Sequence, residues 1–470
     1  MIIKTIPQGS AESHLARRLG LFDTTMIVMG GIIGSGIFIN PYVVAQQVPS
    51  TALILAAWAV GGLTALAGAF IYAELSSQSS VSGGQYVYLR EAFHPSLAFI
   101  YGWALLLVIQ SGGMAAVAVT FAKYLCAIGG VQTSEIRAAW FAAVALGLLT
   151  IINCFGVRAG STTQNLFMIL KLIAIAALVV FGLTVGSPPA SRQMEMPMYS
   201  SSTIWNLLTA FGAALIPVQF AYGGWQTACF VAGEVREPRK NLPRGLLLGV
   251  LGVILIYLSV NFVCVHTLGP QGLAETKTPA SAVMRLALGE NGARIIAAGI
   301  AVSTLGFLSQ SMLTAPRVYF AMAEDGLFFK SLARLNRARV PSFAIALQGA
   351  LAIVIALWGR YEQILNYVVV VDVVFFALSA ACVFVFRQRT RVSDTDETNM
   401  FRVPGHPFTT LFFIFACCAV VFSTVRRYPH NSLIGLGIML TGLPAYLFWR
   451  MRKADIKQTP NAQRPTLNIK

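Results

Sequence analysis

The chain has 470 residues, of which 56% are hydrophobic and only 11% are charged. Soluble domains carry about 25% charged residues, so this composition excludes a soluble or disordered protein and indicates a lipid environment. The net charge of +16 would suggest nucleic acid in a soluble protein, but here the distribution of basic residues has another explanation, and we expect no nucleic acid partner.

Apolar runs recur along the whole chain. A helix that crosses the hydrocarbon core of a bilayer needs about 20 apolar residues, and the runs predict an all-α membrane protein with twelve transmembrane helices. The predicted helices lie, in chain order, at residues 21–47, 50–75, 97–125, 139–155, 163–186, 204–232, 244–267, 294–322, 342–359, 364–386, 408–425 and 432–449.

The basic residues predict the orientation of these helices. Most lysines and arginines fall in the segments that face the cytoplasm if the N-terminus lies inside, as the positive-inside rule requires. An even number of helices then places both termini in the cytoplasm. Residues 1–20 have no apolar signal-peptide core and form the N-terminal cytoplasmic segment, while the basic tail at 450–470 is expected to meet anionic lipid.

Two predicted helices contain clusters of glycine. The first cluster is at residues 30–36 (GGIIGSG), and the second is at 222–225 (YGGW), five predicted helices later. Glycine costs roughly 1 kcal/mol in a helix relative to alanine, so both helices are expected to be interrupted. Glycine can also serve close helix packing alone, but interruptions at equivalent places in two five-helix halves are typical of a substrate site at the membrane midplane.

Such interruptions suit a zwitterion. Freed N–H groups and the positive end of the following helix favour a carboxylate, and freed carbonyls favour an ammonium group. Ser35 adds a hydroxyl donor for the carboxylate. An α-amino acid carries both charges on one carbon, so the pattern favours an amino acid as the substrate.

Several charged residues lie within or at the ends of predicted helices. Asp372 lies eight residues into the tenth helix, where it is either protonated, paired or facing a cavity. Asp23 is expected to favour the N-terminus of the first helix. Glu74 and Glu234 are interpreted as solvated interface residues, with gate pairing to Arg90 or Arg236 as the alternative.

Other classes of function have little support. No filter-like loop indicates a channel, and no HExxH, GxSxG or Walker pattern indicates an enzyme. The five histidines are dispersed and the seven cysteines lack metal-ligand spacing, so we expect neither a metal nor a cofactor, and the cysteines are interpreted as reduced packing residues.

Several motifs resemble the amino acid–polyamine–organocation superfamily, and most closely its L-type amino acid transporter family. The resemblance covers the chain from about residue 15 to 450 and implies an amino acid transporter of the plasma membrane. The motifs are residues 34–38 (GSGIF) followed by Pro41, 72–75 (YAEL), 82–89 (SGGQYVYL), 220–225 (FAYGGW), 234–243 (EVREPRKNLP) and 321–326 (AMAEDG).

The resemblance implies a leucine-transporter-type fold, in which helices 1 and 6 are broken. Residues 21–186 and 204–386 would be two inverted five-helix repeats, and 408–449 would form two peripheral helices. By the same resemblance, the substrate site comprises Ile32, Gly34, Ser35, Gly36, Phe220, Ala221, Gly223 and Gly224, with Phe220 as the gate, and Tyr257 and Asn261 would support the unwound segment.

Lys171 lies about eight residues into the fifth helix, at a depth of roughly 12 Å. A lysine this deep costs about 2.5–3.5 kcal/mol and normally has a functional partner, although snorkelling to the interface is an alternative. The resemblance implies that its ammonium takes the place of a sodium ion, bridging the first and eighth helices near Gly31, Ser303 and Thr304. It therefore implies sodium-independent transport, by exchange or coupled to protons.

Two substrate classes remain open within this family. Neutral L-amino acids are favoured because Lys171 places a cation near the site, while a polyamine or cationic amino acid would use Asp372, the only buried acid expected nearby. In the family that the sequence resembles, the animal members that pair with a heavy chain do so through a cysteine in the outer loop after the third helix. The loop at 127–137 has none and Cys126 borders the helix, so no disulfide-linked heavy chain is expected and a bacterial, self-sufficient transporter is favoured.

Overall fold

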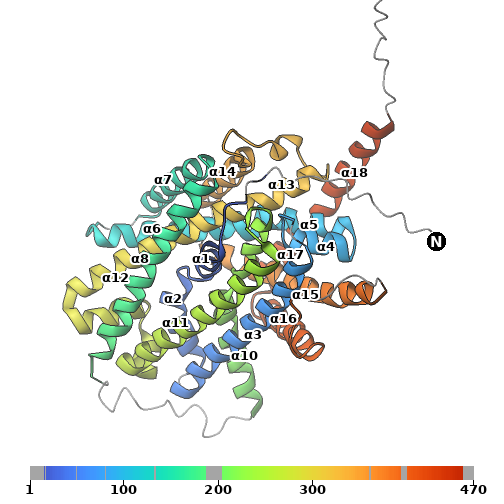
Figure 1. The fold of residues 1–470 in the computed structure, drawn as a ribbon. Helices are drawn as coiled ribbons and strands as arrows, with labels where there is room; N and C mark the ends of the chain where they lie inside the picture. The colour runs from blue at the N-terminus through green and yellow to red at the C-terminus, as the bar shows by residue number, and fades with distance from the viewer. Residues whose placement is uncertain are drawn as a thin grey trace, which may run out of the picture.

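The computed structural model describes residues 15, 17–48, 50–79, 81–131, 134–186, 204–358, 361–392 and 400–458. This part of the chain is helical, and its one β-type contact is an isolated bridge between Leu19 and Val235 (Figure 1). The elements are α1 (Leu21–Ile32), α2 (Gly36–Gln47), α3 (Thr51–Gln78), α4 (Gln85–Ala92), α5 (Pro95–Ala104), η1 (Leu105–Gln110), α6 (Ser111–Ile128), α7 (Glu135–Cys154), α8 (Val157–Leu183), α10 (Ile204–Tyr222), η2 (Trp225–Glu234), α11 (Pro238–Glu275), α12 (Pro279–Thr314), α13 (Pro316–Glu324), η3 (Lys330–Ala333), α14 (Ser342–Trp358), α15 (Tyr361–Val392), α16 (Phe408–Arg427), α17 (Pro429–Leu440) and α18 (Gly442–Gln458).

The described helices confirm an all-α membrane protein. Ten of them are long and apolar enough to cross a bilayer, and the bent pair α1–α2 makes an eleventh. The ninth predicted span corresponds to α14, which is apolar but only 17 residues long. The count of twelve therefore stays a prediction.

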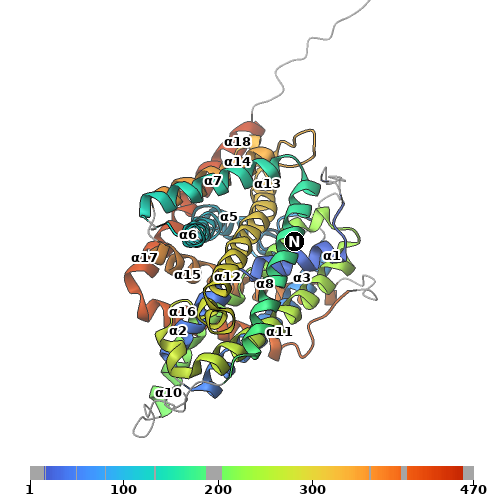
Figure 2. The ribbon, with the colours of Figure 1, turned by 90° about the vertical axis from the view of Figure 1, so that its left-hand side faces the viewer.

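Helices from corresponding positions of the two predicted halves pack on each other. In the described chain, α3 lies against α11, α6 against α12, and α7 against α14; both ribbon views place α7 beside α14 (Figures 1 and 2). A further pair of contacts is equivalent in the two halves. The last helix of the first half, α8, packs on α12 of the second half, and the last helix of the second half, α15, packs on η1 and α6 of the first. A twofold relation between the halves would produce such equivalent contacts.

Small residues allow these helices to approach closely, as is usual in membrane bundles. A Cβ on Gly299 of α12 would lie 2.5 Å from the Cβ of Ala174 on α8. A Cβ on Gly349 of α14 would lie 2.2 Å from the hydroxyl of Thr150 on α7. Side chains larger than glycine at these two positions would separate the helices that enclose the centre of the bundle.

The interpretation of Glu74 and Glu234 as solvated residues is wrong. Both are buried, and each binds an arginine through two hydrogen bonds: Glu234 binds Arg317 at 2.9 and 3.3 Å, and Glu74 binds Arg387 at 2.7 and 2.6 Å. Arg90 instead pairs with Asp325 at 2.5 Å. These partners come from distant segments, so the pattern around each acid does not indicate them.

Candidate functional site

The first transmembrane segment is broken where the sequence predicts it. α1 ends at Ile32, α2 begins at Gly36, and the two helices are bent by 41°. Across the break, the amide of Gly34 donates to the carbonyl of Ile32 at 2.9 Å and that of Phe38 to Ser35 at 3.1 Å. The first amides of α2 have no helical acceptor, so this turn presents polar backbone at the centre of the bundle.

The second break lies directly against the first. α10 ends at Tyr222, and the segment resumes as the 3-10 helix η2 at Trp225. Gly224 has φ +107°, and a Cβ there would lie only 2.1 Å from the carbonyl oxygen of Gly31. The two interrupted segments therefore touch through their backbones, and both the conformation and the space require glycine at position 224.

Tyr257 of α11 ties the two breaks together. Its hydroxyl oxygen lies 3.0 Å from the carbonyl oxygen of Ile32 and 3.1 Å from that of Ala221. One proton is thus shared between the last turns of α1 and α10. Asn261 does not reach a break through a hydrogen bond of its own, because its amide donates to the carbonyl of Tyr257 within α11.

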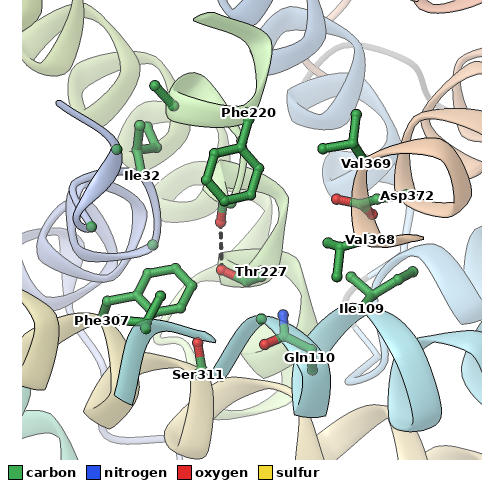
Figure 3. A pocket seen from close by; sticks show the side chains of 18 of the residues that line it. Ile32, Ile109, Gln110, Phe220, Thr227, Phe307, Ser311, Val368, Val369 and Asp372 are labelled. Atoms are coloured by element: carbon green, nitrogen blue, oxygen red, sulfur yellow. Dashed lines mark hydrogen bonds between the residues drawn. The ribbon is translucent and has the colours of Figure 1, made fainter. Parts of the chain in front are cut away.

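A cavity of about 100 Å³ opens between the two breaks (Figure 3). Its walls come from both breaks, from η1 and α6, from α12 and from α15. Every residue that the family resemblance implies for substrate binding lines it, namely Ile32, Gly34, Ser35, Gly36, Phe220, Ala221, Gly223 and Gly224. The structure thus brings these eight residues together, although their roles stay predictions.

Polar side chains that the sequence analysis did not identify complete the wall. Gln310 of α12 donates to the hydroxyl of Thr227 at 2.6 Å, and Thr227 donates to the carbonyl of Gly224 at 2.6 Å; the second bond is drawn in Figure 3. Gln110 of η1 and Ser311 also line the cavity. Polar residues inside apolar spans were the available signal, but sequence alone does not indicate which face of a helix they occupy.

Asp372 faces the same cavity. Its carboxyl group comes from α15, across the cavity from Ile32 (Figure 3). Its Oδ1 atom is buried and has no hydrogen-bond partner within the described residues. The structure therefore shows that this carboxyl group faces the cavity, which is one of the possibilities that the sequence left open.

Lys171 is fully buried in α8, and its ammonium donates to the carbonyl of Ile33 at 2.6 Å. The partner of Lys171 is thus Ile33, the first residue after the end of α1. It is not Gly31, which packs on Gly224 instead. On α12, Ser303 donates to the carbonyl of Gly34 at 3.4 Å.

The hydroxyl of Thr304 is used within α12, since it donates to the carbonyl of Ala301. The Lys171 side chain still meets α12, because a Cβ on Gly306 would lie 3.2 Å from its ammonium nitrogen. The lysine thus contacts the first and eighth segments, as the resemblance implies, but through different atoms. Snorkelling to the interface is wrong for this side chain, because it is buried against the break.

Asp23 has the structural role that the sequence predicts. One carboxylate oxygen accepts the amide of Gly20 at 2.9 Å, which caps α1. The other accepts from Asn165 at 2.8 Å and from Ser161 at 3.3 Å, both on α8. Asp23 therefore fixes the start of α1 against α8.

Comparison with known proteins gives one family for the whole bundle. Residues 19–444 match the family described as amino acid permease. A serine/threonine exchanger of Bacillus subtilis is 31% identical over 450 residues, which are 94% of this chain and 99% of the exchanger. The human large neutral amino acids transporter small subunit 2 is 29% identical over 94% of this chain and 82% of its own length. The human b(0,+)-type amino acid transporter 1 is 29% identical over 81% of this chain and 78% of its own length.

Proposed function

Since this chain belongs to the amino acid permease family, we propose that it carries neutral L-amino acids across the plasma membrane by alternating access, without sodium. The contact between the two broken segments carries the proposal. It brings the first turn of α2, where amides lack helical acceptors, and the carbonyls at the ends of α1 and α10 around one cavity. An amino acid's carboxylate and ammonium groups match these two kinds of backbone group.

The size of the cavity favours an amino acid of small or medium size. One water-sized group needs at least about 10–15 Å³ of such volume, so the cavity of about 100 Å³ holds fewer than ten such groups. This is the scale of serine, alanine or leucine. The names of the relatives, a serine/threonine exchanger and a transporter of large neutral amino acids, support the same substrate class.

The position of Lys171 supports sodium independence. Its ammonium already donates to the carbonyl of Ile33, at the junction of the first break with α8 and α12. An ammonium group there opposes binding of a second cation, and among the described residues no carboxylate pairs with it to compensate. The ammonium of Lys171 would thus stabilise the interrupted backbone at Ile33, as a bound sodium ion otherwise could.

Asp372 supports a second candidate, a polyamine or cationic amino acid. Its carboxyl group lines the cavity and has one oxygen without a partner among the described residues. A cationic side chain reaching α15 would pair with it. Neutral substrates remain the first candidate because the other walls near it, Val368, Val369 and Phe376, are apolar.

We further propose twelve membrane spans, an inverted five-plus-five repeat and cytoplasmic termini. The contacts between the corresponding helices α3 and α11, α6 and α12, and α7 and α14 support the repeat. The words "small subunit" in the name of one relative suggest assembly of that protein with another chain. Here the loop at 127–137 contains no cysteine and Cys126 at its border is buried, so we propose a transporter without a disulfide-linked partner.

Counterflow into proteoliposomes tests the proposal. Vesicles preloaded with unlabelled amino acids receive radiolabelled serine, leucine, arginine or putrescine, each with sodium or with choline. We expect serine or leucine to accumulate equally in both media. Accumulation of arginine or putrescine alone would favour the second candidate, and a requirement for sodium would refute the role of Lys171.

A further inference from the structure

Five arginines surround two adjoining cavities at the end of the bundle where α1 and α8 begin. One cavity, of about 470 Å³, is lined by Arg18, Arg158 and Arg236. The other, of about 180 Å³, is lined by Arg18 and Arg158 again, together with Arg337 and Arg339. The shared residues make this a single basic basin, distinct from the cavity between the two helix breaks.

The backbone under the first arginines is fixed. The amide of Arg18 donates to the carbonyl of Glu234 at 2.8 Å, and the amide of Arg236 donates to the carbonyl of Leu19 at 2.8 Å. This parallel bridge joins the segment before α1 to the segment after η2. It holds two arginines from distant parts of the chain side by side.

A second set of bonds fixes the loop that carries Arg337 and Arg339. The side chain of Asn336 donates to the carbonyl of Cys154 at 2.7 Å and accepts the amide of Ala338 at 2.9 Å. Arg339 has φ +57°, a conformation that costs a non-glycine residue about 1–2 kcal/mol. The loop is therefore held against the start of α8 in a strained form that points arginines to the same basin.

The positive charge of the basin is not neutralised by the described protein. None of the five arginines has an ion pair with a carboxylate of the described residues. Asp23 also lines the larger cavity and offsets part of this charge, while its oxygens accept hydrogen bonds from Gly20, Ser161 and Asn165. The N-terminus of α8 opens into both cavities through Val157 and has no side-chain cap, so its amides add to the attraction for an anion.

An apolar surface leads up to this basin. Phe155, which is 74% exposed, lines the smaller cavity. Along α7 it is preceded at helical spacing by the exposed side chains of Val144, Leu148 and Ile151. Arginines at the end of such a stripe suit a molecule with an anionic phosphate head and an apolar tail.

We propose that this basin is a binding site for the phosphate headgroup of an anionic phospholipid, whose acyl chain lies along α7. We place this lipid in the inner leaflet, a placement that rests on the proposed function because it uses the orientation of the chain proposed there. The five arginines come from the segment before α1, the start of α8, the segment after η2 and the loop before α14. A bound lipid would therefore tie these four segments to one another. Free phosphate offers the same headgroup chemistry but leaves the apolar stripe uncovered.

Native mass spectrometry of the full-length protein in detergent tests this site. Phosphatidylglycerol, phosphatidylcholine or inorganic phosphate is titrated into the wild type, into Arg158→Gln with Arg339→Gln, and into Arg18→Gln with Arg236→Gln. We expect the wild type to bind one phosphatidylglycerol in preference to phosphatidylcholine, and each double variant to bind it about 30-fold more weakly.

The matched control is Arg426→Gln with Arg427→Gln, two exposed arginines that line neither cavity. It should bind phosphatidylglycerol as the wild type does. The site would be refuted if all proteins bound phosphatidylglycerol equally, or if the control lost as much affinity as the double variants. Binding of inorganic phosphate at the same concentration as phosphatidylglycerol would refute the lipid as the ligand. Binding is measured without transport, so failure here is distinct from failure of the proposed function.

Discussion

The carbonyl oxygen of Gly31 lies 2.1 Å from the point where a Cβ on Gly224 would stand. The reverse approach is nearly as close, since a Cβ on Gly31 would lie 2.6 Å from the carbonyl oxygen of Gly224. The two broken segments thus meet backbone to backbone at the wall of the cavity. Side-chain movement cannot relieve a clash between main chains.

Gly224→Ala should therefore separate the breaks. The methyl group has no space, and φ +107° is unfavourable for alanine. We expect at least a tenfold loss of counterflow and a lower melting temperature in detergent. Gly147→Ala on α7 is the control, since nothing lies within 4 Å of its added Cβ; wild-type transport by Gly224→Ala would contradict the contact.

Tyr257→Phe removes the hydroxyl shared by Ile32 and Ala221. An unsatisfied buried acceptor costs about 1–3 kcal/mol, so we expect thermal unfolding to show a loss of this size and transport to fall. Tyr319→Phe is the matched control, because the hydroxyl of Tyr319 is buried with no partner in the described chain. If the two variants unfold alike, the hydroxyl of Tyr257 does not join the breaks.

Lys171→Ala leaves the carbonyl of Ile33 without its donor and removes the charge beside the first break. We expect counterflow in choline medium to fall at least tenfold, while Lys277→Ala in the exposed segment after α11 has no effect. Measuring both variants with added sodium shows whether an ion can replace the ammonium. Undiminished transport by Lys171→Ala would contradict the proposed role of the lysine.

Glu234→Gln leaves the buried guanidinium of Arg317 without its counter-charge. Breaking a buried ion pair in this way costs about 3–5 kcal/mol, and the melting temperature should fall accordingly. Glu234→Leu combined with Arg317→Met should be less destabilised than Glu234→Gln, because no unpaired charge remains. The control is Lys240→Ala, which breaks an exposed pair with Glu237 and should change stability by less than about 1 kcal/mol.

Asp372→Asn separates the two candidate substrate classes. If a cationic side chain pairs with Asp372, the variant should lose arginine transport while retaining serine transport. For the neutral class that we propose first, serine or leucine counterflow should change less than about threefold, since the amide keeps the size of the carboxyl group. The measurement is the inhibition of radiolabelled serine uptake by unlabelled arginine, in the wild type and in Asp372→Asn.

Local features made much of the site predictable. The glycine clusters at 30–36 and 222–225 indicate the breaks, and the structure places them at residues 33–35 and 223–224. Because the two breaks lie against each other, the residues next to each break line the cavity between them. Gln110, Thr227 and Gln310 could not be assigned in advance, because each contributes to the cavity only through the rotation of its own helix against the others.

The amino-acid sequence alone predicts a helical membrane bundle with two interrupted segments, because apolar length and glycine content act within one segment. The pairing of buried groups follows from the packing of helices that are distant in the sequence. Glu234 pairs with Arg317, which lies 83 residues away in the sequence, and Lys171 donates to the carbonyl of Ile33, which lies 138 residues away. Such partners depend on which helices pack side by side, and the hydrophobic periodicity of a helix does not indicate its neighbours.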